Sequence, residues 1–415
     1  MWTKKTIGQV ILLISDGGTP SRNQKENFGG DHCWIVIDDI KDEIYDTKEK
    51  LTDIGLLRCP SYYWELGTVI LSTGATIGEV GITKVKAATK QGISGIVTDP
   101  KLITPEYLKY FFQLNKEKLK SLAQGSTIKE VRPPIVKSIP INLPVDIQEQ
   151  NHIAQILSKA DETISQTETL IAKYQRIKTG LMQDLLTKGI DEQGNIRSKN
   201  THKFIVKNGI EVPEEWETVE LEDSRFFNLA TGGTPSTEVK EYWENGTIPW
   251  MSSGEVHKKE IWFTDTFISE SGFQNSNARY YPADSIIIAL AGQGKTRGTV
   301  AINKVELTSN QSIAAIIPNK AFVEPYFLFY YLESQYDRLR SISAGAGRAG
   351  LSLTIISKVR IPLPKKEEQE RICGIIKGVD NQTNNNIIIS KKLSLIKTGL
   401  MQDLLSGKVR VKSDN

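Results

Sequence analysis

The sequence predicts an α+β protein in which two similar globular domains are separated by a pair of long antiparallel helices, a coiled coil, with a pseudo-two-fold internal repeat relating the two halves. Two observations support this prediction. The decapeptide IKTGLMQDLL occurs at residues 177–186 and again 219 residues later, at 396–405. Around each copy, apolar residues recur three and four positions apart over many turns, as in an amphipathic helix. Because a helix of about 40 residues is roughly 60 Å long and cannot cover its own apolar stripe, each helix requires the other as its partner.

The first predicted domain covers residues 1–145. It is expected to mix strands and helices, because glycines separate short β-prone runs and an aromatic helical segment follows them. The expected strands lie at 34–37, 68–71, 80–82 and 92–97, and the helical segment lies at 105–122. Prolines between 139 and 144 end the domain, since proline removes a ladder donor and stops a helix.

The first long helix is predicted at residues 146–190. Asp146 stands three residues before Glu149, which is the spacing of a capping box at the start of a helix. Gly189 is placed to end the helix. The polar segment that follows, 191–211, is predicted to be a linker.

The second half of the chain repeats the first in the same order, with a domain at residues 212–364 and a second long helix at 365–408. The pentapeptide GGTPS at 17–21 returns at 232–236, and Trp34 returns as Trp250. The loops between matched points differ strongly, whereas the decapeptide is identical in both halves. Two domains that differ suit two different targets, and two identical helical surfaces suit two copies of one partner.

Composition narrows the class of protein. The formal net charge of +3 is nearly balanced and does not by itself indicate a nucleic-acid partner. No apolar stretch approaches the roughly 20 residues of a membrane span, and the apolar run 10–14 is too short for a signal peptide. Cys33, Cys59 and Cys373 lie far apart, and the four histidines have no metal-ligand spacing. We therefore expect a cytoplasmic protein with no membrane segment and no metal site.

The run ALAGQGKT at residues 289–296 resembles a nucleotide-binding P-loop, which requires a strand, a glycine-rich loop and a following helix. Ala289 stands where the first glycine is required, and residues 298–303 after the loop have the pattern of a strand. The matching loop at 72–78 contains no lysine. We favour a positively charged hairpin tip that reaches phosphates or base edges, with an ordinary glycine-rich turn and a P-loop using Lys295 as alternatives.

A second glycine motif, GAGRAG at 345–350, follows an aromatic helical segment and lacks an acidic residue at dinucleotide-binding spacing, so a cofactor site is not expected. Its counterpart, GSTIK at 125–129, also has the pattern of an exposed loop. The GGTPS repeat is expected to be mainly structural, although its hydroxyls are free to face DNA. The candidate DNA-binding residues are Thr19, Ser21, Thr76, Lys129, Thr234, Ser236, Gln293, Lys295, Thr296, Arg297 and Arg348.

Catalytic patterns are missing from the sequence. No carboxylate pair accompanies a lysine as in nucleases, and no N/D-P-P-F/Y tetrapeptide of adenine methyltransferases occurs. These absences favour a recognition subunit that is not an enzyme, and no catalytic residue is assigned. A coiled-coil scaffold without affinity for nucleic acid is a further alternative.

Gly180 and Gly399 lie inside the predicted helices, where a glycine costs about 1 kcal/mol relative to alanine. Their presence in both copies indicates the close approach of another helix, either within the coiled coil or from a partner. We favour a partner, because the flanking polar residues are also identical and are not expected in the seam. The candidate partner-binding residues are Lys178, Thr179, Gly180, Gln183, Asp184, Lys397, Thr398, Gly399, Gln402 and Asp403.

Four features, taken in order along the chain, closely resemble the specificity subunit of type I restriction-modification systems. They are GGTPS at the start of each domain, the hairpins TGATIG and AGQGKTRG at 73–78 and 291–298, the EQxxI helix openings at 149–153 and 368–372, and the paired decapeptide. The resemblance covers essentially the whole length. The second helix departs from the first in having Lys365 and Lys366 where the first has its aspartate cap.

The resemblance implies two target-recognition domains, each reading one half of a split sequence in double-stranded DNA. The two helices would set the spacing of the half-sites and dock two copies of a DNA adenine methyltransferase subunit. A restriction and translocase subunit would join the assembly for cleavage. S-adenosylmethionine and ATP would belong to these partners, so no cofactor is expected on this chain.

Overall fold

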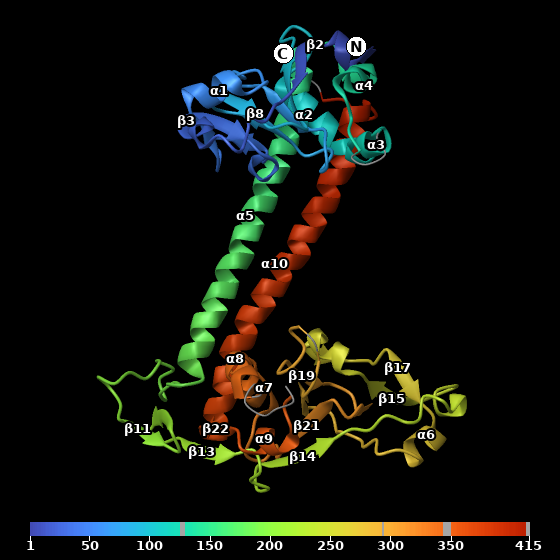
Figure 1. Ribbon diagram of the computed structural model, residues 1–415. Coiled ribbons are helices and arrows are strands. Elements are labelled where there is room, and N and C mark those ends of the chain that lie inside the picture. Colours follow the sequence, from blue (N-terminus) through green and yellow to red (C-terminus); the bar gives the residue numbers. More distant parts are fainter. Residues whose placement is uncertain (125–128, 293, 343–349, 412–415) are drawn as a thin grey trace. The chain divides into compact units, whose positions relative to one another are not determined.

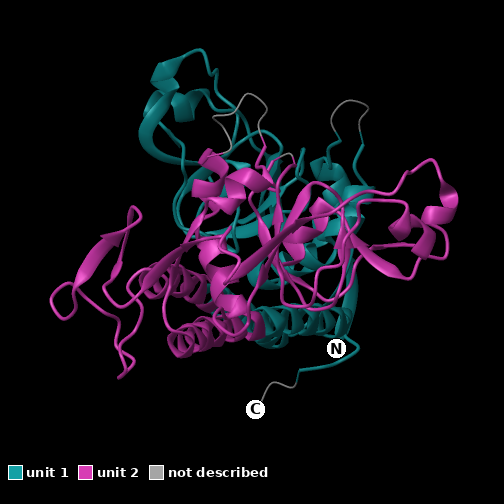
Figure 2. Cartoon of the chain, turned by 90° about the horizontal axis from the view of Figure 1, so that it is seen from below, with its two compact units in different colours: residues 1–169, 386–415 teal, residues 170–385 magenta. Residues whose placement is uncertain are grey.

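The computed structural model describes residues 1–124, 129–292, 294–342 and 350–411. The chain forms two compact units, which are coloured separately in Figure 2: unit 1 contains Met1–Thr169 and Asn386–Asn415, and unit 2 contains Leu170–Asn385. Both predicted long helices are present, α5 at Ile147–Leu185 and α10 at Lys366–Ser406 (Figure 1). Each helix contributes one section to each unit, so unit 1 is built from both ends of the chain.

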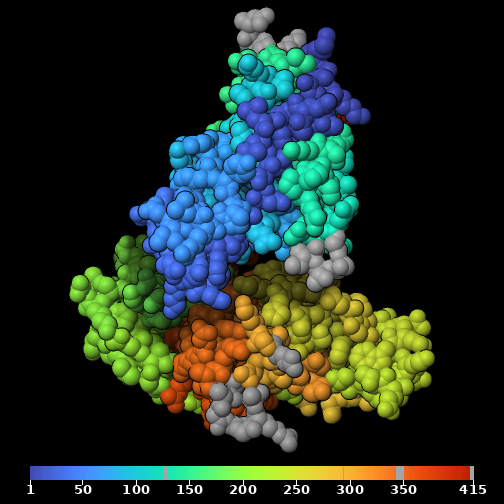
Figure 3. Space-filling model, turned by 45° about the horizontal axis from the view of Figure 1, so that its top comes forward, coloured from blue at the N-terminus to red at the C-terminus, as the bar shows by residue number. Residues whose placement is uncertain are grey.

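Unit 1 contains two mixed sheets and a separate pair of strands. The five-stranded sheet has the order β2 (Ile11–Asp16), β9 (Ile93–Thr98), β6 (Val69–Ser72), β7 (Val80–Thr83) and β4 (Glu43–Ile44). The three-stranded sheet has the order β5 (Lys50–Leu51), β3 (Phe28–Ile35) and β8 (Ala87–Thr89). β1 (Trp2–Thr6) pairs with β10 (Pro140–Pro144), and Figure 3 shows the dark-blue N-terminal segment beside the green segment near residue 140. The helices are α1 (Asp53–Arg58), α2 (Pro105–Leu114), α3 (Lys116–Ser121) and α4 (Pro133–Ser138).

Unit 2 repeats this order of elements. Its five-stranded sheet runs β14 (Phe227–Thr231), β21 (Ile313–Pro318), β18 (Ile286–Ala289), β19 (Val300–Asn303) and β16 (Glu260–Ile261). Its three-stranded sheet runs β17 (Thr266–Ile268), β15 (Ile248–Met251) and β20 (Thr308–Ser309), and β13 (Glu217–Glu220) pairs with β22 (Arg360–Leu363). The helices are α6 (Glu270–Gln274), α7 (Pro325–Ser334), α8 (Tyr336–Ile342) and α9 (Leu353–Ser357). The duplication predicted from the sequence therefore extends to the strand order of both sheets.

The segment predicted as a linker is partly structured. It contains β11 (Phe204–Lys207), which forms an antiparallel hairpin with β12 (Ile210–Pro213) in unit 2. The first unit has no such hairpin between the corresponding elements among its described residues.

The predicted aromatic helical segment is two helices, α2 and α3, because the chain turns at Asn115. Asn115 donates hydrogen bonds to the Phe111 carbonyl from its side chain, at 2.8 Å, and from its backbone, at 3.1 Å. These bonds close the last turn of α2. The equivalent break in unit 2 occurs at Gln335, between α7 and α8.

The start of α5 confirms half of the predicted capping box. The Asp146 carboxylate accepts a hydrogen bond from the Gln148 backbone N–H at 2.9 Å. The other half of the prediction was wrong, because the buried Glu149 side chain binds Trp2 and Arg410 and does not turn back to the helix start. Helix α5 ends at Leu185, before Gly189, which lies in the following turn with a φ of +66°.

Each unit has a core that includes one end of each long helix. In unit 1, Ile153 and Leu157 of α5 and Leu404 of α10 pack with Tyr107 and Phe112 of α2. In unit 2, the core contains Leu185 of α5, Ile372 and Ile376 of α10, Phe327 of α7 and the buried Trp216. Within each unit the two helices run antiparallel, because the start of one lies beside the end of the other. No helix among the described residues is long and apolar enough to cross a membrane.

Candidate nucleic-acid interface

The two GGTPS loops are held by a buried tryptophan. Trp34 Nε1 donates to the Gly18 carbonyl at 3.1 Å, and Trp250 Nε1 donates to the Gly233 carbonyl at 3.0 Å. A Cβ at Gly17 would lie 2.2 Å from the Thr89 carbonyl oxygen, so the backbone there has no room for a side chain. The predicted structural role of this motif is confirmed, and the loop presents the threonine that follows the two glycines at the edge of the sheet.

In unit 1 the GGTPS loop borders a groove. Cavities of 340, 660 and 460 Å³ share lining residues: Thr76 lines the first two, and Thr19 and Gln91 line the first and third. Lys129 lines the second cavity. The structure thus brings together three of the residues predicted to bind DNA, Thr19, Thr76 and Lys129, although they are up to 110 positions apart in the sequence. The exposed Ser21 is not among the lining residues.

The groove carries charges of both signs, with more cations than carboxylates, and its acidic lining residues are Asp16, Glu79 and Glu130. The basic residues that line it, beyond Lys129, are Lys90, Lys116, Lys120 and Arg132. Lys116 Nζ lies 2.6 Å from Glu79 Oε1, and Lys120 Nζ lies 2.6 Å from Glu117 Oε1. Lysine and arginine neutralise phosphates, and hydroxyls and amides hydrogen-bond to base edges, so this lining suits a DNA backbone and bases. The sequence did not single out these four cations, because their elements are separated along the chain.

The predicted hairpin geometry of ALAGQGKT is confirmed, while its contact with DNA stays a prediction. The segment joins β18 to β19, which are antiparallel neighbours in the five-stranded sheet, and among the described residues 294–303 no helix follows the glycines. A P-loop needs a helix N-terminus at that point to hold phosphates, so the nucleotide-binding alternative that uses Lys295 loses its structural basis. Lys295 is exposed at the tip, and its carbonyl accepts a hydrogen bond from Tyr336 of α8 at 2.9 Å.

Thr296 and Arg297 of this hairpin contact neighbouring elements of unit 2. Thr296 Oγ1 lies 3.1 Å from His257 Nε2, in the 3-10 helix Ser253–Lys258. The Arg297 carbonyl accepts from Arg340 Nη1 of α8 at 3.1 Å, and Arg297 Nε is buried without a hydrogen-bond partner among the described residues. The hairpin is therefore attached to α8 at two carbonyls.

Beside each hairpin lie a threonine and a glutamine, which are hydrogen-bonded to each other in unit 2 and line the same cavities in unit 1. Thr234 Oγ1 donates to Gln311 Oε1 in unit 2, and Thr19 and Gln91 line the same two cavities in unit 1. A backbone hydrogen bond joins the start of each hairpin to the residue that follows the glutamine. Leu290 N donates to Ser312 O at 2.8 Å in unit 2, and Thr73 N donates to Gly92 O at 2.8 Å in unit 1. Both glutamines are exposed, and the sequence indicated them only as matched positions.

Two candidate residues, Gln293 and Arg348, lie outside the described residues. Ser236 is exposed, and its backbone carbonyl accepts a hydrogen bond from Trp243 Nε1 at 3.1 Å. Its hydroxyl remains a candidate with no assigned contact.

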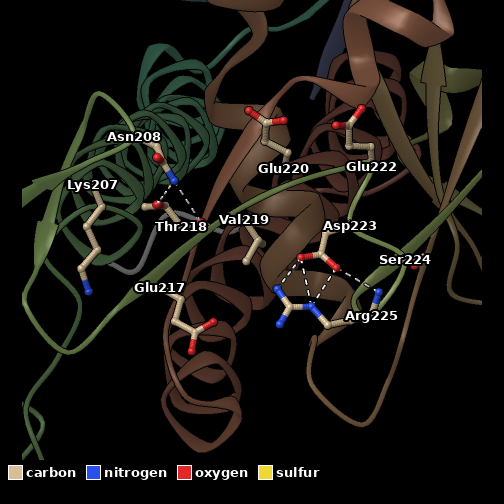
Figure 4. Close-up of a pocket in the computed structure, with 10 residues that line it drawn as sticks. All are labelled: Lys207, Asn208, Glu217, Thr218, Val219, Glu220, Glu222, Asp223, Ser224 and Arg225. Atoms are coloured by element: carbon tan, nitrogen blue, oxygen red, sulfur yellow. Dashed lines mark hydrogen bonds and ion pairs between the residues drawn. The ribbon is translucent and has the colours of Figure 1, made fainter.

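A cavity of 750 Å³ in unit 2, away from the hairpin, is lined by four carboxylates together with Lys207 and Arg225 (Figure 4). Glu217, Glu220, Glu222 and Asp223 line it, and Arg225 folds back to Asp223 with Nη2 2.6 Å from Oδ2. Such a lining repels phosphates, so this cavity is not part of the candidate interface. In the described part of the chain, no group of three or more histidine, cysteine or carboxylate side chains is arranged to hold a metal ion.

The identical decapeptides present a mixed surface. Thr179, Gln183, Thr398 and Gln402 are exposed. A Cβ built at Gly180 or Gly399 would meet no described atom within 4 Å beyond the backbone of its own helix. No close approach within the described chain therefore accounts for these glycines.

Lys178 and Lys397 lie differently from the sequence expectation, because both take part in contacts between the two helices. Lys178 Nζ lies 2.7 Å from Asp380 Oδ1, and Lys397 forms an ion pair with Asp161. Their side chains are only 18% exposed. Asp184 and Asp403 bind lysines just beyond the helix ends, Lys188 at 2.7 Å and Lys408 at 3.0 Å.

The EQ pairs at the helix starts join each helix to its domain. Gln150, fully buried, donates to the Leu102 and Pro144 carbonyls at 2.9 Å and accepts from Thr104 N at 3.0 Å. Gln369 makes the same three bonds, to Phe322, Pro364 and Glu324.

The glutamates that precede these glutamines, Glu149 and Glu368, also bind residues outside the helices. Glu149 accepts from Trp2 Nε1 at 3.1 Å and from Arg410 Nε at 2.6 Å. Burial acts to raise the pKa of Glu149, but the hydrogen bonds from Arg410 and Trp2 outweigh it and hold that pKa below its usual value. Glu368 accepts from Trp216 Nε1 at 3.2 Å and from Arg197 Nη2 at 3.1 Å. The sequence analysis did not single out Trp2, Arg197 or Arg410. Trp2 and Trp216 stand at nearly the same distance before GGTPS, whereas the segments that carry the two arginines differ in length.

Two duplicated domains, each with a hydroxyl-bearing hairpin beside an exposed glutamine and a tryptophan-held GGTPS loop, lie on an antiparallel helix pair and define a two-site recognition protein. The family described as type I restriction modification DNA specificity domain matches residues 1–176 and 213–393. The chain therefore belongs to this family.

Known relatives match all or about half of the chain. The type I restriction enzyme MjaVIII specificity subunit of Methanocaldococcus jannaschii is 26% identical over 422 residues, which cover 100% of this chain and 94% of the relative. The EcoR124I/EcoR124II specificity subunit of Escherichia coli is 29% identical over 204 residues, 48% of this chain and 50% of that protein. The crystal structure of a type I restriction-modification S subunit from M. genitalium has a TM-score of 0.61 at 18% identity, and the match covers 98% of this chain and 96% of that one. These similarities support the assigned fold.

Proposed function

We propose that the chain is the sequence-specific DNA-recognition subunit of a type I restriction-modification complex, in which unit 1 and unit 2 each read one half of a bipartite, asymmetric site. The observation that carries this proposal is the matched arrangement on each unit, in which a tryptophan-anchored GGTPS loop, a threonine and an exposed glutamine lie beside a hairpin. The scaffold is the same in both units, while the hairpin side chains differ. The same backbone geometry therefore presents different base-reading groups.

The side chains near the two hairpins differ in type, which supports recognition of different bases by the two units. Unit 1 offers Thr76 at its hairpin and lysines along the groove, whereas unit 2 offers Lys295, Thr296 and Arg297. Arginine and lysine hydrogen-bond to guanine, and glutamine to adenine, in the major groove. The exposed Gln91 and Gln311 are suited to adenine in either half-site. No catalytic role is proposed for any residue of this chain.

We further propose that the exposed face of the decapeptides docks two copies of a DNA adenine methyltransferase subunit, with a restriction and translocase subunit completing the assembly in the cytoplasm. S-adenosylmethionine and ATP would bind those partners. Open space over Gly180 and Gly399 leaves room for close approach of a partner backbone. Gly374 and Gly378 of α10 have the same open space, but only Gly180 and Gly399 occur at matched positions in both helices, and this duplication supports a docking role.

Gly180→Ala and Gly399→Ala test this docking face. Each substitution is expected to raise the free energy of unfolding by up to about 1 kcal/mol, because alanine favours the helix and the new methyl group meets open space. The same variants are expected to bind the methyltransferase more weakly. Thermal unfolding and co-purification measure the two effects.

Gly378→Ala is the matched control, because Gly378 also lies inside α10 in open space but outside the decapeptide. It is expected to stabilise the chain and leave co-purification unchanged. Full retention of the methyltransferase by Gly180→Ala/Gly399→Ala would argue against the proposed face.

Adenine methylation of host DNA tests the main proposal. Deleting the gene for this chain is expected to abolish methylation at one bipartite motif, as read by methylation-sensitive sequencing. An unchanged methylome would refute the proposal. Restoring the gene with Gln311→Ala is expected to relax specificity in one half-site only, with about 1–3 kcal/mol less discrimination at one base pair. Gln91→Ala is expected to affect the other half-site.

A further inference from the structure

A polar cluster in unit 2 links three helices. Lys178 of α5 lies 2.7 Å from Asp380 of α10, and Tyr330 of α7 donates to Asp380 Oδ2 at 3.1 Å. Glu333, one turn further along α7, lies 3.8 Å from Lys178 Nζ and accepts from Lys259 at 2.6 Å. The cluster therefore joins both long helices to a helix of the globular domain and to the segment that precedes β16.

Unit 1 contains the same cluster with the helices exchanged. Lys397 of α10 pairs with Asp161 of α5, and Tyr110 of α2 donates to Asp161 Oδ2 at 3.0 Å. Gln113, one turn further along α2, lies 3.4 Å from Lys397 Nζ and donates to Asp42 at 2.8 Å. Asp42 stands where unit 2 has Lys259, so the outer contact has changed from an ion pair to a hydrogen bond, while the lysine, aspartate and tyrosine are the same.

The two clusters are partly shielded from water. Lys178 and Lys397 are 18% exposed, Asp380 is 29% exposed and Asp161 is 20% exposed. Burial and the neighbouring aspartate raise the pKa of Tyr110 and of Tyr330, so both hydroxyls keep their protons and remain donors at neutral pH. Each aspartate thus has two fixed partners, one on the other long helix and one on the domain.

A short path of two successive helices and two hydrogen bonds connects the unit 2 cluster to the hairpin between β18 and β19. Helix α7, which carries Tyr330 and Glu333, continues through Gln335 into α8. From α8, Tyr336 and Arg340 donate to the carbonyls of Lys295 and Arg297 at 2.9 and 3.1 Å. A rotation of α7 on the helix pair would therefore carry the hairpin with it.

We infer that Lys178 and Lys397 are positioning residues that fix the orientation of each domain on the helix pair, and through it the half-site spacing that the protein accepts. This inference rests on the proposed DNA-recognition function. The two lysines of the decapeptide then hold the helices and the domain together within the chain, whereas Thr179, Gly180 and Gln183 remain on the exposed face. The decapeptides are therefore identical for two reasons: their lysines make the same contacts within each unit, and their exposed residues bind the same partner.

Specificity for the spacer separates positioning from simple stability. A lysine that only stabilised the fold would, when replaced, lower the amount of active protein and weaken all sites equally. A positioning lysine would, when replaced, allow the domain to sit in more than one orientation, so sites with one base pair more or fewer in the spacer would gain relative to the natural site.

The experiment compares methylation by the full chain, expressed with its host methyltransferase, at sites with the natural spacer and with spacers one base pair longer and shorter. Lys178→Met/Lys397→Met is expected to reduce discrimination between spacers about tenfold, which corresponds to about 1.4 kcal/mol. Lys178→Arg/Lys397→Arg is expected to restore most of it, because arginine can still bind both the aspartate and the α7 or α2 side chain. The half-site sequences are expected to stay the same in every variant.

Lys159→Met is the control, because Lys159 lies on the same helix in an exposed ion pair with Glu162, also of α5. It is expected to leave the spacer preference unchanged. Unchanged discrimination in Lys178→Met/Lys397→Met, with the bipartite motif intact, would overturn the positioning role alone. A wild-type chain that directs no bipartite methylation would instead refute the proposed function.

Discussion

Glu368→Ala is expected to lower the free energy of unfolding of unit 2 by about 3–5 kcal/mol, the range for removing one partner of a buried ion pair. The carboxylate is the shared acceptor for Arg197, for the Trp216 indole and for the Ile190 backbone N–H, at 3.0 Å. Glu368 is 7% exposed and Arg197 is 8% exposed, so water cannot replace the lost bonds. Chemical denaturation followed by tryptophan fluorescence measures the effect.

Glu149→Ala provides the internal comparison. Arg410, its partner, has a side chain 49% exposed and can turn to solvent when the carboxylate is removed. The loss of stability in unit 1 is therefore expected to be smaller than that caused by Glu368→Ala in unit 2. Since the pKa of Glu149 is lowered by folding, its contribution is present at neutral pH and is lost as the pH falls through the lowered pKa. If Glu149→Ala and Glu368→Ala lowered the free energy of unfolding equally, the exposure of the arginine partner would not determine the loss, which would contradict this explanation.

Inserting four residues into each long helix, after Thr169 in α5 and after Asn385 in α10, is expected to change the spacer of the recognised site or to abolish recognition. Four residues add about 6 Å to a helix, close to two base-pair steps of B-DNA at about 3.4 Å each. They also add about 40° of net rotation, because a helix turns about 100° per residue. Both changes act on the spacing and facing of the domains and leave their hairpins untouched. Methylation-sensitive sequencing of host DNA identifies the spacer.

The reference for this variant is a substitution of the four residues before each insertion point by alanine, which keeps the helix length. That variant is expected to retain the natural spacer. A changed half-site sequence with the spacer kept would contradict the proposal that the helices set the spacing.

Periodicity and repetition revealed most of the architecture. The apolar pattern around the decapeptides predicted both long helices to within a few residues, because their buried stripes have the helical period. The β-prone runs predicted β6, β7 and β9, whereas the run predicted at 34–37 overlaps β3 only at Trp34 and Ile35. The repeat of GGTPS and Trp34 predicted that the second domain would follow the same order. The short strands β4, β5 and β20 had no signal of their own, since two or three residues carry no period.

The interface was predicted only in part, because it is assembled from segments that are distant along the chain. The hydroxyl and lysine candidates Thr19, Thr76 and Lys129 do meet in one groove. Gln91 and Gln311 were visible in the sequence as matched positions, but nothing local to them indicated exposure beside the hairpins.

The partner face was also predicted only in part. Sequence identity alone could not separate Lys178, which faces Asp380, from Thr179 and Gln183, which face solvent. Only the phase of the helix relative to its neighbours makes that distinction, and this phase is set by tertiary packing.

Unit 1 combines the start and the end of the chain, and this imposes an order on its folding during synthesis. Ile153, Ala154 and Leu157 reach their buried state only with Leu404 and Leu405 beside them, and Arg410 reaches Glu149 last. A ribosome that adds about 5–20 residues per second needs about 12–50 s to make the chain from Thr169 to Arg410. Unit 2 extends to Asn385, so it can be completed only while the stretch from Asn385 to Arg410 is added, about 1–5 s of that time. For most of synthesis the nascent chain therefore carries an uncovered apolar strip at Ile153, Ala154 and Leu157, and this strip is where chaperone binding or premature association of nascent chains would be concentrated.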